Sequence, residues 1–153
     1  MDARFELGCD GPTTLVVGVD GTDTATRALY YALGLARRQH SNVIAVYAMT
    51  TAAGYDAMGL AGYDAMGAAQ HQASLELAEE LKSKIQALAA DYHVKSKFVS
   101  VPGDPVTVLI KIAAEHHADG IVLGASTAIG HRLFGSAAVR AVRRCRCPVT
   151  VVP

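Results

Sequence analysis

A glycine-rich stretch is the part of this sequence best suited to contact an anion. It runs from Gly124 to Ser136 (GASTAIGHRLFGS), after an apolar run and before a helical pattern. Glycine lets a backbone approach a phosphate closely, and the amides at a helix start point toward an anion. His131 and Arg132 could pair with a phosphate or lie in a solvated loop. Because glycines also serve turns and Ser136 could act only as a helix cap, the stretch predicts either a phosphate site or a turn.

Asp20 is a second residue that could contact a ligand. It ends an apolar run and opens the turn Asp20-Gly-Thr-Asp23. A carboxylate in this place either binds a ligand or serves the turn through its side-chain oxygens. We favour the ligand role, because Asp20 falls where the strand order below predicts a crevice.

The sequence carries no signature of a dedicated catalyst. It has no Gly-Lys-Ser/Thr of a P-loop, no Gly-x-Gly-x-x-Gly, and no Gly-x-Ser-x-Gly around Ser126 or Ser136. His116 and His117 have no third or fourth ligand at a recognisable spacing, so we predict no metal site in the chain. We therefore expect a protein that is not an enzyme.

Apolar runs and helical patterns alternate along the chain, which indicates strands and helices in turn. This order is typical of a parallel sheet with helices on both faces, and right-handed crossovers favour a doubly wound, five-stranded α/β fold. Ligands of such sheets bind at the carboxyl ends of the strands. The expected strands are 15–19, 43–49, 97–101, 119–123 and 148–152, and the expected helices are 24–39, 68–92, 105–117 and 136–144.

Composition limits the class of protein. Of the 153 residues, 51% are hydrophobic and 18% charged, which excludes disorder for the whole chain and allows one domain with a real core. Lys+Arg and Asp+Glu are equal at 14 each, so we expect no nucleic-acid partner. No apolar run has the length of a membrane span, so we expect no membrane association.

The three cysteines point to a reducing compartment. Their number is odd, and Cys145 and Cys147 are separated by one residue. In a strand, positions two apart share a face but are poorly placed to bridge each other. We therefore predict free thiols and a cytoplasmic location. The basic run Arg140 to Arg146 lies at a helix C-terminus, where positive charge is favourable, and we interpret it as structural.

Two segments fall outside this core. Residues 1–13 form a flexible lead-in that ends in a turn signal. Residues 50–67 form a mobile loop with an internal repeat, since Gly54-Tyr-Asp-Ala-Met-Gly59 recurs as Gly62-Tyr-Asp-Ala-Met-Gly67. The repeat is either a duplication in a tolerant loop or a lid over the crevice, and we favour the duplication.

Four short segments, by their order and spacing, resemble the universal stress protein family. They are Val17-Gly-Val-Asp20-Gly-Thr22, Gly103-Asp-Pro105, Gly135-Ser136 and Arg144-Cys-Arg-Cys-Pro148-Val-Thr-Val-Val152. The resemblance covers residues 14–153, which we take as one domain of this type. It implies a Rossmann-like sheet with the strand order 3-2-1-4-5.

The family's ATP-binding members carry Gly-x-x-Gly, nine residues, and then Gly-Ser or Gly-Thr. Here Gly124 matches the first glycine and Gly135-Ser136 the last pair, whereas Thr127 stands at the second glycine. Only seven residues, 128–134, follow Thr127, so the loop is two residues shorter than the family pattern. We expect this shortening to cost a triphosphate more affinity than it costs adenosine.

The resemblance implies the role of each residue in a nucleotide site. Asp20 would contact the adenosine part, Ala48 would offer backbone atoms to the adenine edge, and Gly103 would leave room beside the ribose. The ligand would be ATP or another adenine nucleotide, which Mg²⁺ could accompany. The nucleotide-binding residues predicted in this way are Gly18, Val19, Asp20, Ala48, Gly103, Leu123, Gly124, Thr127, Gly135, Ser136 and Ala137.

The predicted function is a stress-response or regulatory module that binds an adenine nucleotide without dedicated catalysis, with weak or no hydrolysis. The alternative is a universal stress protein that binds no nucleotide and acts as a dimeric interaction module. Residues 148–153 form a short apolar edge strand, and an open apolar edge invites pairing. We predict a homodimer across this strand, which is also where the family commonly dimerises.

Overall fold

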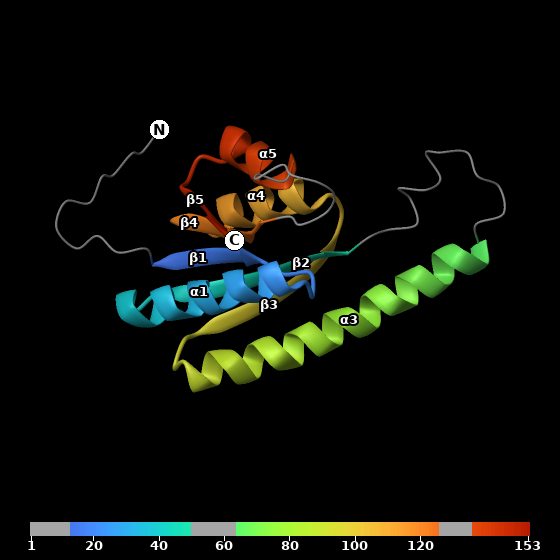
Figure 1. The fold of residues 1–153 in the computed structure, drawn as a ribbon, viewed down its shortest axis with the longest axis horizontal. Helices are drawn as coiled ribbons and strands as arrows, with labels where there is room; N and C mark the ends of the chain where they lie inside the picture. The colour runs from blue at the N-terminus through green and yellow to red at the C-terminus, as the bar shows by residue number, and fades with distance from the viewer. Residues whose placement is uncertain (1–12, 50–63, 126–135) are drawn as a thin grey trace.

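The computed structural model describes residues 13–49, 64–125 and 136–153, which form a layered α/β domain (Figure 1). Its five parallel strands lie in the order β3-β2-β1-β4-β5, as predicted. The elements are β1 (Thr14–Gly18), α1 (Asp23–Gln39), β2 (Asn42–Met49), α3 (Asp64–Asp91), β3 (Ser96–Pro102), α4 (Pro105–Glu115), β4 (Gly120–Gly124), α5 (Ser136–Arg144) and β5 (Val149–Val152).

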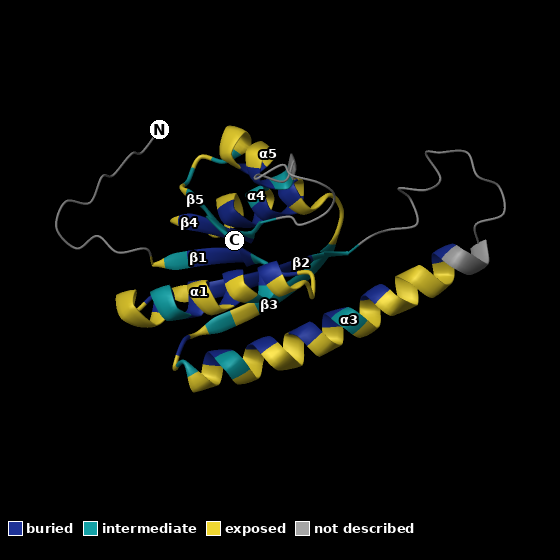
Figure 2. Cartoon of the chain, viewed as in Figure 1, coloured by how far each residue is buried: buried dark blue, intermediate teal, exposed yellow. Residues whose placement is uncertain are grey.

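The central strand is buried on both faces, which explains why its sequence is a continuous apolar run. Leu15 and Val17 of β1 pack into a core shared with α1 and α3, whereas Val16 packs into a second core shared with α4 and α5. Figure 2 shows the buried face of each helix turned toward the sheet. The two faces of the sheet are therefore covered by two helix pairs, as expected for a doubly wound fold.

Polar residues cap two helices that begin at the carboxyl edge of the sheet. Thr22 caps α1, because its side chain accepts a hydrogen bond from the amide of Ala25. Asp104 caps α4 through the amide of Thr107, and Pro105 occupies the first turn of that helix, where its missing N–H costs nothing. These caps fix where the chain turns from strand to helix at the carboxyl edge of the sheet.

The helix α3 begins at Asp64, so the prediction of a start at Ala68 was four residues late. A glycine at position 67 suggested a boundary, but one glycine inside a helix costs only about 1 kcal/mol. The buried stripe of α3 is Ala78, Leu81, Ile85 and Ala89, while Leu77 and Leu88 pack at its margin. Residues 1–12 and 50–63 lie outside the described ranges, and with them the lead-in and most of the repeat.

The segment between α5 and β5 carries two cysteines. Cys145 and Cys147 lie in a turn that precedes β5 and not in a strand, and their sulfur atoms are 3.1 Å apart. The argument that positions two apart are poorly placed to bridge each other applies to an extended strand, whereas these two cysteines lie in a bend that brings their sulfur atoms close. Both thiols are free in the structure.

Asp119 links the start of β1 to the start of β4. Its Oδ2 atom accepts hydrogen bonds from the amides of Thr13 and Thr14 at 2.7 and 2.9 Å.

None of the helices in the described ranges has both the length and the apolar character needed to cross a bilayer.

Candidate functional site

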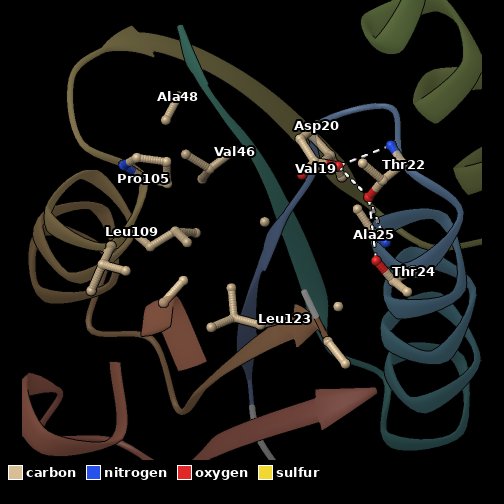
Figure 3. Close-up of a pocket in the computed structure, with 15 residues that line it drawn as sticks. Val19, Asp20, Thr22, Thr24, Ala25, Val46, Ala48, Pro105, Leu109 and Leu123 are labelled. Atoms are coloured by element: carbon tan, nitrogen blue, oxygen red, sulfur yellow. Dashed lines mark hydrogen bonds between the residues drawn. The ribbon is translucent and has the colours of Figure 1, made fainter. Parts of the chain in front are cut away.

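A cleft of about 320 Å³ opens at the carboxyl edge of the sheet, where the winding reverses between β1 and β4 (Figure 3). This is the place at which doubly wound sheets bind their ligands. Most of the lining side chains are apolar. The residues that line the cleft are Gly18, Val19, Asp20, Thr22, Thr24, Ala25, Val46, Ala48, Pro105, Val106, Leu109, Leu123, Gly124, Ala125 and Ala137.

Three helices begin at this cleft. Thr24 and Ala25 belong to the first turn of α1, Pro105 and Val106 to the first turn of α4, and Ala137 to the first turn of α5. The unpaired amides at a helix start give that end a partial positive charge. A cleft that collects three such ends is suited to a ligand with negative charge at one end and apolar surface at the other.

Asp20 lies at the rim, where its carboxylate holds the turn into α1. Its Oδ1 accepts hydrogen bonds from the amide and the hydroxyl of Thr22, at 2.9 and 2.6 Å (Figure 3). The same hydroxyl group lies 3.3 Å from the hydroxyl of Thr24. Asp20 is exposed, and its second carboxylate oxygen has no hydrogen bond within the described residues. The role of Asp20 in this turn is therefore established. Its Oδ2 atom, which no described residue engages, is available to a ligand.

Gly124 ends β4 against the first turn of α1. A Cβ atom at this position would lie 2.5 Å from the carbonyl carbon of Thr24 and 2.6 Å from the amide nitrogen of Ala25. Side chains do not pack at such distances, so no other residue fits here without displacing α1. Gly124 thus has a packing role that is independent of any phosphate.

An ion pair joins α5 to the start of α4 on one side of the cleft. The Nη2 atom of Arg140 lies 2.7 Å from Oδ2 of Asp104, the residue that caps α4. Arg144 also reaches this helix start, donating to the hydroxyl of Thr107 at 3.3 Å. The hydrogen bond from Arg140 lowers the pKa of Asp104 from 3.8 to about 2, and the bonds from Thr107 act in the same direction. Two arginines of the basic run therefore have structural contacts.

Seven of the predicted site residues line the cleft, namely Gly18, Val19, Asp20, Ala48, Leu123, Gly124 and Ala137. Gly103 follows β3 with φ +141, and its amide donates to the carbonyl of Met49, but it is not among the lining residues. Thr127 and Gly135 lie outside the described residues, as does the side chain of Ser136.

Sequence reasoning missed the lining residues contributed by the first turns of α1 and α4. Thr24, Pro105 and Leu109 come close to the strand ends only because their helices pack on the sheet. A signal was available for some of them, since the caps at Thr22 and Asp104 mark where each helix starts beside the crevice. No local signal marks Leu109, which reaches the cleft from one turn further along α4.

The charges around the cleft are sparse. Within the described part of the chain, the lining contains one carboxylate, Asp20, and neither lysine nor arginine. No group of three or more His, Cys, Asp or Glu side chains in the same ranges is placed to hold a metal ion. Within these ranges, the attraction for an anion comes from backbone amides alone.

Comparison with known proteins places the chain among relatives of the same fold. A universal stress protein of Methanocaldococcus jannaschii is 28% identical over 140 residues, which span 90% of this chain and 80% of the relative. The universal stress protein UspA from Lactobacillus plantarum has a TM-score of 0.80 at 25% identity, with 92% and 97% of the two chains covered. A universal stress protein solved in complex with cAMP has a TM-score of 0.71 at 23% identity, covering 94% and 99%. The family model described as the universal stress protein family matches residues 12–153, and the chain therefore belongs to this family.

Proposed function

We propose that this protein is a regulatory module of the stress response that binds an adenine nucleotide in the cleft between β1 and β4. The observation that carries the proposal is the meeting of three helix starts over an apolar wall at the carboxyl edge of the sheet. A nucleotide has the matching character, with an apolar base and an anionic phosphate. The complex of a relative with cAMP supports the same class of ligand.

The adenosine part would lie beside Asp20 and Ala48. Ala48 stands at the end of β2 beside Val46 and above Leu109 of α4, a surface suited to one face of a purine (Figure 3). The oxygen of Asp20 that no described residue engages could accept a hydrogen bond from a ribose hydroxyl, as acidic residues do in dinucleotide sites. The phosphate would lie over Gly124 and the start of α5, near Thr127, Gly135 and Ser136.

We further propose that the protein binds its nucleotide without turning it over efficiently. Within the described lining, Asp20 is the only residue with an ionisable side chain, and its Oδ1 atom is already engaged by Thr22. A phosphoryl-transfer catalyst needs groups that orient a nucleophile and neutralise charge in the transition state. A Mg²⁺ ion bound with a triphosphate would supply part of that charge, and this ion stays a prediction.

The protein is proposed to act as a homodimer through residues 148–153. All four residues of β5 are half-buried in the single chain, and β5 is an edge of the sheet with β4 on one side only. An edge strand of Val-Thr-Val-Val carries the β-branched residues that pair well and has no charge to deter pairing.

A matched pair of substitutions tests the nucleotide site. Ala48→Trp would fill the adenosine end of the cleft, whereas Ala87→Trp makes the same change on the exposed face of α3. Thermal-shift and calorimetric titrations with ATP, ADP, AMP and cAMP should show binding to the parent and to the α3 variant. Ala48→Trp should lose at least about tenfold in affinity, or roughly 1.4 kcal/mol.

The same titrations separate the two function classes. If the parent binds no adenine nucleotide at millimolar concentration, the proposal fails, and a nucleotide-free interaction module takes its place. If both variants bind as well as the parent does, a nucleotide site exists but lies elsewhere on the molecule. Melting of both variants without ligand controls for damage to the fold.

A further inference from the structure

We propose that Cys145 and Cys147 form a reversible dithiol–disulfide pair that hydroperoxides oxidise within a single chain. The structural observation is the 3.1 Å distance between the two sulfur atoms, in a turn that leads from α5 into the edge strand β5. Neither thiol is among the described residues that line the cleft, so the inference stands independently of the proposed function.

The backbone holds the two thiols together from both sides. The amide of Cys145 donates to the carbonyl of Ala141 at 2.8 Å, which fixes it to the end of α5. The carbonyl of Pro148 accepts from the amide of Ile121 at 2.9 Å, which fixes the chain after Cys147 to β4. A disulfide needs a sulfur–sulfur distance of about 2 Å, so closure requires a movement of only about 1 Å. Both side chains are half-buried, which leaves a small oxidant access to them.

The two thiols have different roles in the oxidation. Burial raises the pKa of Cys147 to about 12, and the hydrogen bond that its S–H group can donate to Cys145 acts in the same direction, so Cys147 favours the protonated thiol. The attack on the peroxide therefore falls to Cys145, whose sulfur lies 3.1 Å from that of Cys147 and can accept a hydrogen bond from its S–H group.

Oxidation of the two thiols proceeds in two steps. The thiolate form of Cys145 attacks one oxygen of the peroxide and becomes a sulfenic acid, and the leaving alkoxide, or hydroxide in the case of hydrogen peroxide, takes up a proton to give an alcohol or water. The sulfur of Cys147 then attacks the sulfenic sulfur, which expels hydroxide, and the thiol proton converts this hydroxide to water. Two electrons pass from the two sulfurs to the peroxide, and the chain loses two hydrogen atoms.

The ring closed by this bond is small, since one residue separates the cysteines. Strained disulfides are reduced more readily than structural ones, and such labile bonds suit regulation. Cellular thiols such as glutathione should therefore reopen the bond. This also agrees with a compartment in which structural disulfides are not expected, because disulfides formed there are usually transient.

Peroxide titration of the full chain tests the proposal. The parent protein and every variant in this test carry Cys9→Ser, so that the third thiol cannot react with peroxide or form a disulfide. Addition of hydrogen peroxide should lower the intact mass by two hydrogen atoms, with no dimer on a non-reducing gel, and peptide mapping should join Cys145 to Cys147. Excess reduced glutathione should restore the original mass.

Two single variants test the order of attack. Cys147→Ser should stop at a sulfenic acid on Cys145, which dimedone traps. Cys145→Ser should react with peroxide at least about tenfold more slowly, because the remaining thiol is protonated. Circular dichroism melting shows whether each variant folds, and Cys147→Ala replaces the serine variant if it does not.

Two results would overturn the inference. One is oxidation of the two cysteines to separate sulfinic acids with no bond between them. The other is a disulfide that forms only between chains. Equal peroxide rates for the two single variants would overturn the assigned roles of the thiols.

Discussion

Gly124 and Thr24 lie so close together that the end of β4 and the first turn of α1 share one packed contact. A Cβ at residue 124 would stand 2.5 Å from the carbonyl carbon of Thr24. Both residues also line the cleft. The contact between Gly124 and Thr24 therefore determines both how α1 packs on the sheet and the shape of the candidate site.

Gly124→Ala should destabilise the protein by about 1–3 kcal/mol, because the added methyl group must displace the backbone of α1. Gly120→Ala, at the other end of β4, is the matched control. Its Cβ would meet Leu15 at 3.5 Å and the carbonyl of Pro148 at 3.6 Å, which are ordinary contacts. Urea unfolding should show a change below about 1 kcal/mol for the control. Equal effects of the two substitutions would contradict the packing role of Gly124.

ATP should bind less than about tenfold more tightly than AMP. The described lining offers a phosphate chain no lysine or arginine, and the sequence predicts a loop toward Gly135 that is shorter than in the ATP-binding members of the family. Calorimetry with adenosine, AMP and ATP measures the contribution of each added phosphate.

Gly135→Val should remove the phosphate-dependent part of the affinity, because a branched side chain blocks close approach of the backbone. Adenosine itself should bind to the variant as it binds to the parent, which serves as the internal control. Undiminished ATP binding by Gly135→Val would show that the glycine stretch is not the phosphate site.

Asp104 should contribute to stability in two separable ways. Asp104→Asn keeps a side chain that can cap α4 but loses the ion pair with Arg140, and we expect a loss of about 0.5 kcal/mol for this half-exposed pair. Asp104→Ala also loses the cap and should cost about 1–2 kcal/mol. Urea unfolding at neutral pH measures both changes, and combining Asp104→Asn with Arg140→Met should add little to either alone. Additive effects would mean that the pair contributes nothing.

The contribution of the Asp104 charge should disappear in acid. Its pKa is about 2 in the folded protein and 3.8 without the contacts, so the folded state favours the charged form. The stabilisation is therefore complete above about pH 4 and is lost as the pH falls toward 2. The stability difference between the parent and Asp104→Asn should shrink over this range. A difference that stays constant on acidification would exclude the ion pair as its source.

Val151→Lys should convert the proposed dimer to monomer. Val151 lies in the edge strand, opposite Leu123 of β4, and lysine on an edge strand opposes pairing with another chain. Val142→Lys places the same charge on α5, where the side chain is 60% exposed, and should leave the dimer intact. Sedimentation velocity at micromolar concentration distinguishes the two outcomes. A parent that sediments as a monomer would remove the basis for the dimer.

The sheet was predictable from the sequence because its strands are short apolar runs. The turns after these strands contain polar residues that can cap the next helix, which marks where each strand ends. The turn from Asp20 to Asp23 was recognised from the sequence, and Thr22 within it caps α1. The start of α3 was missed, because Gly67 suggested a break that the favourable packing of the rest of the helix overrides.

The contacts that shape the site were less accessible to sequence reasoning. Asp104 and Arg140 are 36 residues apart, and nothing local pairs them. Gly124 was recognised as a glycine near a phosphate, but its contact with α1 depends on how a helix from the start of the chain packs on a later strand. Cys145 and Cys147 were judged from strand geometry, whereas the turn they occupy brings their sulfurs together.

The three helix starts at the cleft follow β1, β3 and β4 and so come from well-separated parts of the chain. A ribosome releases the first turn of α5 only after all four preceding strands have been made. A growing chain therefore has no complete cleft until α5 has been made, so a nucleotide bound in the complete cleft would act only after the four preceding strands have formed. Ligand bound there would instead hold the first and last segments together, so protection from unfolding should extend to the whole domain at once.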